Sequence, residues 1–245
     1  MANYLLISGS STIGCVAAKS LIDKGHNIII TGRNEEKIAN IANELGVKYK
    51  VLDASNFDDV DRVFANVKEH FGEINGIVNF SGSLLIKPAH LTSRQNFDSV
   101  ISDNLTTAFA VVRACGNHMN ITGGSVVLIS SAVAMVGVVN HEAIAAAKAG
   151  IIGLAMSAAA SYSNNNLRFN VVAPGLTDTN LTKSIISNTD SLKFSKAMHA
   201  LGRIGKPEDI ASAIVFFLSP ENDWITGQVL AVDGGLSNVR PKLKI

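Results

Sequence analysis

Residues 127–150 contain side chains that can move protons, at a spacing that lets them act together. Ser130 and Ser131 end an apolar run, and the alanine-rich stretch after them carries Lys148. At about 100° per helical residue, His141 lies on the same helix face as Lys148, about 10.5 Å away along the axis, whereas Glu142 points away. Histidine, with an ordinary pKa near 6.5, suits general acid–base catalysis. Helix geometry therefore makes His141 a candidate for proton transfer on the face that carries Lys148.

Composition limits the classes of protein and partner. Of the 245 residues, 47% are hydrophobic and 17% charged, which indicates a folded chain with a sizeable core. A net charge of +1 without a long basic run argues against nucleic acid or an anionic membrane as partner. Two cysteines, Cys15 and Cys115, predict no disulfide framework and fit a reducing compartment. We recognise no signal peptide, and therefore expect a cytoplasmic protein. We also expect a small-molecule substrate and no metal.

Short apolar runs alternate with helical patterns along the whole chain. Seven runs are too short for helices and are typical of buried parallel strands. This alternation requires parallel pairing through right-handed crossovers. We therefore predict an α/β fold with a doubly wound parallel seven-stranded sheet (Rossmann fold) and helices on both faces, as one domain over residues 1–245. The expected strands are residues 4–7, 27–31, 49–52, 76–79, 125–129, 167–173 and 229–232, and the expected helices include 34–45, 56–71, 104–119 and 140–162.

Ligands of such sheets bind at the carboxyl ends of the strands. The first strand leads into the loop Gly9–Gly14, where backbone N–H groups and a helix start form an anion site suited to a pyrophosphate. The hydroxyl groups of Ser10, Ser11 and Thr12 add hydrogen-bond donors. Because the loop has few glycines, an ordinary strand-to-helix turn is the alternative. Its position after the first strand favours nucleotide binding.

The end of the second strand indicates which dinucleotide binds. An acidic residue at this place binds the adenosine ribose, whereas an arginine accommodates a 2′-phosphate. The chain has Gly32 where the acid would lie and Arg33 beside it. Bidentate contact between arginine and phosphate favours NADP(H), and NAD(H) stays an option because Arg33 is alternatively a solvated surface residue.

Further motifs follow the other strands: Asn79-Phe-Ser-Gly82, and Pro174-Gly175 with Thr179. Together with the reaction segment, they resemble the short-chain dehydrogenase/reductase family over nearly the whole chain. The resemblance implies hydride transfer between a nicotinamide and a substrate carbon, with Ser131 polarising the carbonyl oxygen, Lys148 binding the nicotinamide ribose and Asn104 holding a proton-relay water. It implies cofactor contacts from Gly9, Ser10, Ser11, Thr12, Ile13, Gly14, Arg33, Asp53, Ala54, Asn79, Ser81, Gly82, Lys148, Pro174, Gly175, Thr177 and Thr179.

Two positions depart from the family pattern. Thr12 stands where the phosphate loop has its middle glycine, so a side chain leaves less room for backbone to approach a phosphate. The family's catalytic tyrosine lies four residues before the lysine, and that position is Ile144, which cannot transfer a proton. In the enoyl-reductase branch of the family, seven residues separate tyrosine and lysine, and this spacing falls on His141. His141 is therefore the candidate in this segment for the proton-transfer role of the missing tyrosine.

Alternatives stay open for each catalytic candidate. His141 is alternatively a helix-entry residue that binds the backbone, or one that only lines the pocket. Ser130 is the alternative to Ser131 as the inward serine. Lys148 is alternatively a surface lysine stretched along its helix, although its register with Ser131 argues against this.

The substrate side is expected to be apolar. Residues 176–205 correspond to the segment that the family uses as a mobile substrate lid. Ala132, Val133, Met135 and Val136 predict a pocket for an acyl chain or a cyclic ketone. Small residues in the predicted helices 104–119 and 143–160, such as Ala108, Ala110, Ala114, Ala149, Gly153 and Ser157, predict packing against a symmetry mate in a homo-oligomer, a tetramer or dimer, unless these faces pack only within the subunit.

Three functions are consistent with these patterns. The first is an NADP(H)-dependent oxidoreductase acting on a carbonyl, alcohol or enone, which the presence of Asn104, Ser131 and Lys148 favours. The second is an inactive dinucleotide-binding homologue, a sensor or partner subunit, which Ile144 favours. The third is a non-redox lyase or isomerase that uses His141.

Overall fold

Seven parallel strands form one sheet in the order β3-β2-β1-β4-β5-β6-β7, which confirms the predicted fold class. The computed structural model describes residues 1–240, and residues 241–245 of the predicted domain lie outside the described part. Strand β1 pairs in parallel with β2 on one side and with β4 on the other, and the strand order reverses between β1 and β4. Such a reversal opens a crevice at the carboxyl ends of the two strands. The strands are β1 (Asn3–Ile7), β2 (Asn27–Gly32), β3 (Lys48–Val51), β4 (Gly76–Asn79), β5 (Gly124–Ile129), β6 (Leu167–Pro174) and β7 (Val229–Val232).

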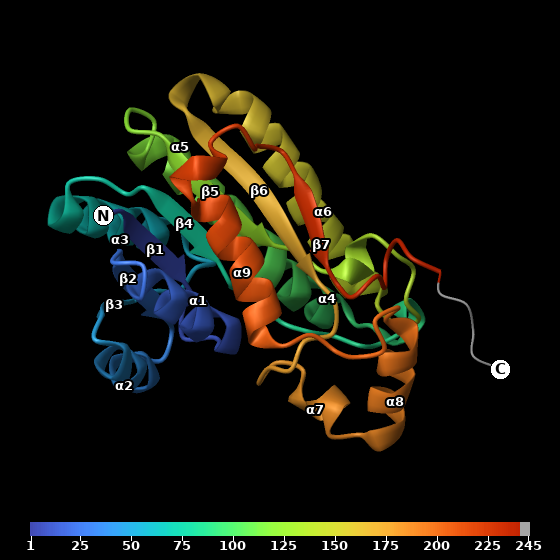
Figure 1. Ribbon diagram of the computed structural model, residues 1–245. Coiled ribbons are helices and arrows are strands. Elements are labelled where there is room, and N and C mark those ends of the chain that lie inside the picture. Colours follow the sequence, from blue (N-terminus) through green and yellow to red (C-terminus); the bar gives the residue numbers. More distant parts are fainter. Residues whose placement is uncertain (241–245) are drawn as a thin grey trace.

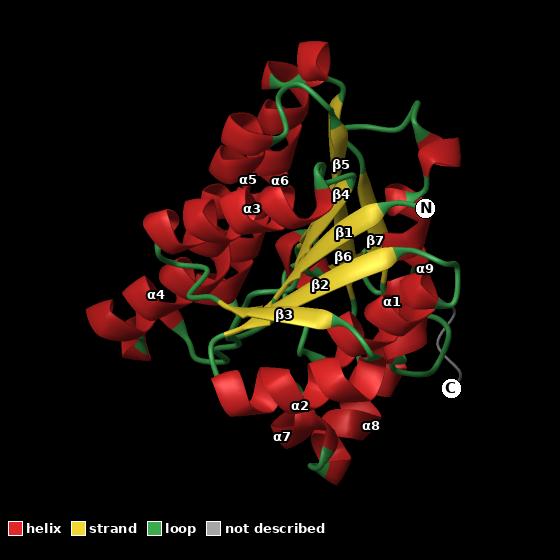
Figure 2. Ribbon diagram, turned by 90° about the vertical axis from the view of Figure 1, so that its left-hand side faces the viewer, coloured by secondary structure: helices red, strands yellow, loops and turns green. Residues whose placement is uncertain are grey.

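Helices cover both faces of the sheet (Figure 2). Helices α1, α2 and α9 pack on one face around a core that includes Leu6, Ile30 and Ile214. Helices α3, α5 and α6 pack on the other face around Phe64 and Phe169. The α-helices are α1 (Thr12–Ile22), α2 (Glu35–Leu45), α3 (Phe57–Phe71), α4 (Arg94–Ile101), α5 (Thr107–His118), α6 (Glu142–Ser161), α7 (Lys183–Ile186), α8 (Thr189–Met198) and α9 (Pro207–Leu218), and short 3-10 turns span Ala89–Leu91, Ala132–Ala134, Ser163–Asn165 and Pro220–Asn222.

Side-chain caps fix where the first three helices begin. The Oγ of Ser11 accepts a hydrogen bond from an α1 amide, and the side chains of Asn34 and Asn56 do the same for α2 and α3. Each cap satisfies a backbone donor that has no partner inside the helix. The helices therefore start within a short loop of the strand ends where ligand groups were predicted.

The predicted helical segment 104–119 is found as part of a longer helical stretch that starts with α4, but its first turn is π-helical. Helix α5 begins at Thr107, and a π-helical turn over Ser102–Thr106 joins it to α4. The side-chain amide of Asn104 donates to the Val100 carbonyl oxygen at 2.9 Å, so the side chain takes an acceptor that a regular helix would give to a backbone amide. Such turns occur frequently at functional sites, because they turn one side chain out of helical register.

Two short helices lie apart from the sheet. Figure 1 shows α7 and α8 beyond the carboxyl ends of the strands, in the stretch between β6 and α9. The two ends of the segment that carries α7 and α8 are held together by backbone contacts. Thr177 forms a β-bridge with Gly205, and the Gly205 amide donates to the Leu176 carbonyl oxygen at 2.8 Å. This stretch coincides with the predicted lid, residues 176–205.

Helix α6 is the one described helix that is long and apolar enough to span a membrane, judged by length and composition alone. It packs against β6, α4 and α5. Its outward positions Ala149, Gly153 and Ser157 are exposed, whereas the small residues of α5 named above are buried inside the subunit. Packing against a symmetry mate thus stays a prediction for α6, and Ala108, Ala110 and Ala114 pack within the subunit.

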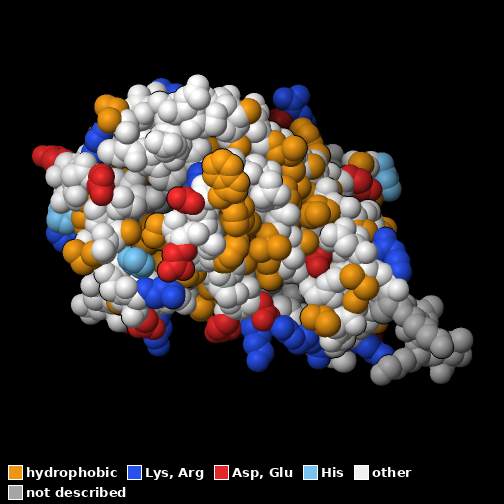
Figure 3. Space-filling view, turned by 45° about the horizontal axis from the view of Figure 1, so that its top comes forward, with side chains coloured by type: hydrophobic (Ala, Val, Ile, Leu, Met, Phe, Trp, Pro, Cys, Tyr) orange, Lys and Arg blue, Asp and Glu red, His pale blue; other side chains and the backbone are white. Residues whose placement is uncertain are grey.

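Hydrophobic side chains also gather on the surface. Figure 3 shows a band of them across the middle of one face, between scattered charged groups. Near the free edge of the sheet at β7, Phe216, Trp224 and Leu230 are exposed large hydrophobic residues. Exposed apolar surface of this kind is common at contacts between proteins, so a homo-oligomer stays the prediction.

Candidate functional site

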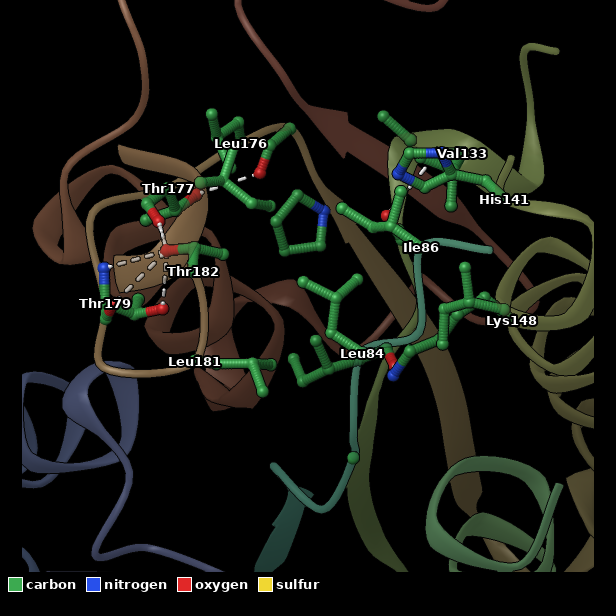
Figure 4. Close-up of a pocket in the computed structure, with 18 of the residues that line it drawn as sticks. Leu84, Ile86, Val133, His141, Lys148, Leu176, Thr177, Thr179, Leu181 and Thr182 are labelled. Carbon is green, nitrogen blue, oxygen red and sulfur yellow. Dashed lines mark hydrogen bonds between the residues drawn. The ribbon is translucent and has the colours of Figure 1, made fainter. Parts of the chain in front are cut away.

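A cavity of about 710 Å³ opens at the carboxyl ends of the strands. Its walls come from the loop before α1, the ends of β4 and β5, the start of α6 and the segment after β6. Figure 4 shows Lys148 and His141 on one side, the threonines 177, 179 and 182 on the opposite side, and Leu84 between them. Residues far apart in the sequence thus meet where the strand order predicts a ligand site.

Two glycines shape the loop between β1 and α1. A Cβ at Gly9 would lie 2.9 Å from a backbone oxygen of β1, and a Cβ at Gly14 would lie 2.6 Å from the Gly9 carbonyl oxygen. The Oγ of Ser11 accepts from the Gly14 amide at 3.1 Å. The amides of Thr12 and Ile13 have no acceptor within the helix, and both residues line the cavity. The loop therefore presents a helix N-terminus to the cavity.

The two serines after β5 have different partners. Ser130 is buried, and its hydroxyl donates to the Lys148 carbonyl oxygen at 2.8 Å, which ties β5 to α6. The Oγ of Ser131 accepts from the Val133 amide at 3.4 Å, so its proton is free for another acceptor. Both serines line the cavity. These partners favour Ser131 over Ser130 as the serine that meets a ligand.

Lys148 is buried at the cavity wall, so the alternative of a surface lysine is wrong. The side chain is 8% exposed, and its Nζ donates to the Ile129 carbonyl oxygen at 3.0 Å. Burial lowers the pKa of the ammonium group from its ordinary 10.5 to about 8, because desolvation disfavours the charged form. Lys148 is therefore charged at neutral pH but holds its proton less tightly than an exposed lysine.

Asn104 approaches Lys148 from the π-helical turn. Its side-chain amide donates to Val100 and, at 3.2 Å, to the Ser83 hydroxyl. Its Oδ1 is buried and has no hydrogen-bond partner within the part of the chain that the structure describes. A Cβ at Gly82 would lie 2.8 Å from this oxygen and 3.2 Å from the Lys148 Nζ. Gly82 therefore keeps open the approach between the amide oxygen and the ammonium group.

The predicted helix 140–162 begins later than expected, because α6 starts at Glu142. Ile144 lies in its first turn, and His141 is the N-cap residue just before it. Ile144 is 2% exposed and packs with Val100 and Val133 in a small hydrophobic cluster beside the cavity. The Nδ1 of His141 lies 2.7 Å from the Val139 carbonyl oxygen, and since a carbonyl only accepts, Nδ1 carries a proton. Nε2 is then the nitrogen that can gain or lose one. Both residues line the cavity. His141 thus combines the two features expected of it as alternatives to catalysis, a hydrogen bond to the backbone and a position at the cavity wall.

No tyrosine lines the cavity within residues 1–240. Tyr4 lies in β1, Tyr49 in β3 and Tyr162 at the end of α6. The hydroxyl of Tyr4 donates to the Leu218 carbonyl oxygen, which is on the far side of the sheet from α6. A phenol is therefore not supplied to this cavity from another part of the described chain.

The ends of β2 and β3 carry the groups predicted for the adenosine half. Arg33 is mostly exposed, with its guanidinium 3.9 Å from the Asp103 carboxylate. A Cβ at Gly32 would lie 3.0 Å from the Ser10 Oγ, so the end of β2 abuts the loop before α1. Asp53 accepts from the amide and hydroxyl of Ser55, at 3.0 and 2.7 Å. These contacts order the Asp53 carboxylate at the protein surface.

Lys37 is a cavity residue that the sequence reasoning missed. Its amide donates to the Oδ1 of Asn34, the N-cap of α2, at 2.8 Å, which places Lys37 in the first turn of that helix. Its position four residues beyond Arg33, in the first turn of a capped helix, is the signal that could have identified it. The cavity wall therefore includes a basic side chain from α2.

The predicted cofactor residues divide into a lining set and a supporting set. Asn79 is buried behind the wall, where its Oδ1 accepts from the Ser81 amide at 3.1 Å, and the Ser81 hydroxyl bonds to the Ser8 hydroxyl at 2.8 Å. Gly9, Gly14, Ala54 and Asn79 thus lie outside the lining, as do Arg33, Asp53 and Asn104. The lining set is Ser10, Ser11, Thr12, Ile13, Ser81, Gly82, Lys148, Pro174, Gly175, Thr177 and Thr179.

The remaining wall is largely apolar, as predicted, although two of its expected residues are wrong. Ala132 and Val133 line the cavity, whereas Met135 and Val136 do not. The short turn Ala132–Ala134 ends at Met135, so the chain turns away and returns later. The apolar lining consists of Ile13, Phe80, Leu84, Ile86, Ile129, Ala132, Val133, Val138, Val139, Ile144, Leu176, Leu181, Ile185, Phe194, Met198 and Leu236.

Two further groups hold the segment after β6. The Thr182 hydroxyl bonds to the Thr177 carbonyl oxygen and to the Thr179 hydroxyl, the latter at 3.0 Å. His199 is buried, with Nδ1 2.6 Å from the Ser195 carbonyl oxygen and Nε2 accepting from the Leu176 amide at 3.2 Å. The imidazole therefore joins α8 to the end of β6. Sequence patterns gave neither role, because each depends on how the segment folds back.

Within residues 1–240, no group of three or more His, Cys, Asp or Glu side chains is placed to hold a metal ion. The polar groups at the cavity are instead hydroxyls, backbone amides, the side-chain amides of Asn140 and Asn180, the imidazoles of His141 and His199, and lysines. This set suits an anionic and hydroxyl-bearing ligand beside an apolar one.

Comparison with known proteins agrees with this geometry. Residues 7–237 match the family described as "Enoyl-(Acyl carrier protein) reductase". The chain is 35% identical over 244 residues to the 3-oxoacyl-[acyl-carrier-protein] reductase FabG of Chlamydia muridarum, covering 95% of this chain and 96% of that protein. It is 33% identical over 237 residues to the 3-oxoacyl-[acyl-carrier-protein] reductase of Mus musculus, covering 94% and 96%.

The fold also matches a solved structure. A short-chain type dehydrogenase/reductase from Mycobacterium ulcerans superposes with a TM-score of 0.92 at 29% identity, covering 98% of this chain and 91% of that chain. The similarity therefore extends over the sheet, both helical layers and the segment after β6.

Proposed function

Because the chain belongs to the short-chain dehydrogenase/reductase family of oxidoreductases, we propose that it is an NADP(H)-dependent reductase of a carbonyl or enone in an apolar acyl substrate. The observation that carries the proposal is the single cavity that joins the helix N-terminus of α1 to Ser131, His141 and Lys148. The names of the two acyl-carrier-protein reductases to which it is similar support an acyl substrate. The apolar wall, with Leu84 and others, suits such a chain.

The residues present fit a dinucleotide. The amides of Thr12 and Ile13 and the hydroxyls of Ser10 and Ser11 would hold the pyrophosphate at the start of α1. Lys148, whose ammonium group is buried with one backbone acceptor, would bind the nicotinamide ribose. When bound, the dinucleotide supplies the hydride.

Two basic side chains support a preference for NADP(H). Arg33 follows β2 and Lys37 lies one turn later at the cavity wall. A 2′-phosphate near both would make charge-assisted hydrogen bonds, which NAD(H) cannot make. The end of β2 has Gly32 in place of the acidic residue that would repel this phosphate.

In the proposed reaction, the side chains of this chain orient the carbonyl and move the proton. The Ser131 hydroxyl, whose proton is free, donates to the carbonyl oxygen. His141 gives a proton from Nε2 while Nδ1 stays bonded to the Val139 carbonyl oxygen. We propose that Ile144 replaces the family's tyrosine and, being buried and apolar, excludes water near the reacting carbon.

The test is NADPH oxidation by the purified protein with a panel of 3-oxoacyl thioesters, ketones and enones. We expect His141→Ala to lower kcat about 100-fold or more, in line with the loss of a general acid, and His90→Ala, at an exposed position outside the cavity, to change it little. Full activity in His141→Ala would refute the role of His141. If no substrate is turned over, the proposed reaction fails.

Ile144 favours a second candidate, a dinucleotide-binding homologue without hydride chemistry. This candidate predicts tight NADPH binding by calorimetry without oxidation of NADPH by any compound of the panel. A third outcome, conversion of a hydroxyacyl substrate with unchanged nicotinamide, would identify a lyase or isomerase that uses His141.

A further inference from the structure

Thr12 connects two walls of the cavity that are far apart in the sequence. Its Oγ1 accepts a hydrogen bond from the backbone amide of Asn180 at 3.2 Å, across 168 residues. Thr12 is the first residue of α1, and Asn180 lies in the segment after β6. Both residues line the cavity.

The rest of that segment is held by its own contacts. Its root is fixed by the Asp178 amide, which donates to the Gly205 carbonyl oxygen at 3.0 Å. Its turn is closed by Thr182, whose hydroxyl bonds to the Thr177 carbonyl oxygen and accepts from the Thr179 amide at 3.2 Å. The turn is therefore preformed, and its hydrogen bond to the opposite wall comes from Thr12.

The family pattern has a glycine at the place of Thr12, and glycine has no hydroxyl to offer. The threonine side chain adds this acceptor without disturbing the helix start, because Ser11 supplies the cap. The bond to Asn180 lies beside the amides of Thr12 and Ile13, where the proposed pyrophosphate would bind.

We propose that Thr12 is a positioning residue that clasps residues 179–182 to the loop before α1, and that this clasp slows the exchange of bound dinucleotide. The clasp itself stands on the Thr12–Asn180 contact, whereas its effect on exchange rests on the proposed function. Opening of residues 179–182 away from α1 must then precede release of the pyrophosphate.

Three variants separate the contact from other effects of substitution. Thr12→Val keeps the shape of the side chain and removes the acceptor. Thr12→Ser keeps the hydroxyl and should behave like the natural protein. Asn180→Ala is the matched control, because the donor is the backbone amide and survives the loss of the side chain.

The first measurement is hydrogen exchange of a peptide that contains Asn180, without nucleotide. An exposed hydrogen bond contributes modestly to stability, so we expect about 2- to 5-fold faster exchange of this amide in Thr12→Val. Thr12→Ser and Asn180→Ala should match the natural protein, and the midpoint of thermal unfolding should stay unchanged. Equal exchange in Thr12→Val and the natural protein would overturn the clasp.

The second measurement is the rate of NADPH dissociation by stopped-flow fluorescence. We expect about 2- to 5-fold faster release from Thr12→Val and a natural rate for Thr12→Ser. Faster amide exchange with an unchanged release rate would overturn the effect on dinucleotide exchange. If the natural protein binds no NADPH, the proposed function fails, and hydrogen exchange still decides the clasp.

Discussion

Replacement of Lys148 by methionine tests the electrostatics of the cavity. Methionine fills a similar volume and removes the ammonium group. In the folded protein, burial lowers the pKa of Lys148 to about 8, while the unfolded chain has the ordinary value of 10.5. Protons therefore bind more tightly to the unfolded chain, and protonation of Lys148 favours unfolding.

The magnitude follows from these two values. When Lys148 is fully protonated in both states, the difference corresponds to about 3 kcal/mol of lost stability. The loss is complete well below pH 8 and disappears as the pH rises to 10.5, where the unfolded chain also loses its proton. Between pH 7 and pH 9.5, the free energy of unfolding of the natural protein should rise by about 2 kcal/mol relative to Lys148→Met.

The assay is urea unfolding of both proteins without nucleotide at several pH values in this range. Lys19→Met, at an exposed position of α1, controls for the removal of one positive charge. A difference between natural protein and Lys148→Met that stays constant with pH would refute the argument that Lys148 is buried as a destabilised cation. The same variant should bind NADPH more weakly, because the ribose would lose its ammonium partner.

Three further predictions concern other cavity residues. Lys37→Met should raise the KM for NADPH about 5-fold and leave that for NADH unchanged, because only the former has a 2′-phosphate; an equal effect on both would contradict this. Gly82→Ala should lower the free energy of unfolding by about 1–3 kcal/mol in urea titrations, since its Cβ would lie 2.8 Å from the Asn104 Oδ1; unchanged stability would show that the wall yields. Ile144→Ala should lower it by about 2–5 kcal/mol, because the side chain is 2% exposed; a loss below 1 kcal/mol would mean that Ile144 is not part of the core.

The relative positions of Ser131 and Lys148 in the reaction segment could be predicted from the sequence. The positions of Ser131 and Lys148 followed from the end of an apolar run and from the spacing along one helix. The structure places both at one cavity wall, with His141 two turns before Lys148. The sequence could not say which serine had a free proton, because the partner of Ser130 is the carbonyl oxygen of a residue 18 positions away.

The amino-acid sequence by itself determined the seven strands and their parallel pairing, because short apolar runs and the helical patterns between them are local signals. The order of the strands in the sheet came from the structure. Only the tertiary structure decided the burial of Lys148, the place of Lys37 at the cavity and the contact of Thr12 with Asn180. Each of these depends on how chain segments from different strand ends approach one another. The desolvation of a side chain and the hydrogen bonds it makes depend on neighbours from other segments. A pattern within one segment therefore cannot predict them.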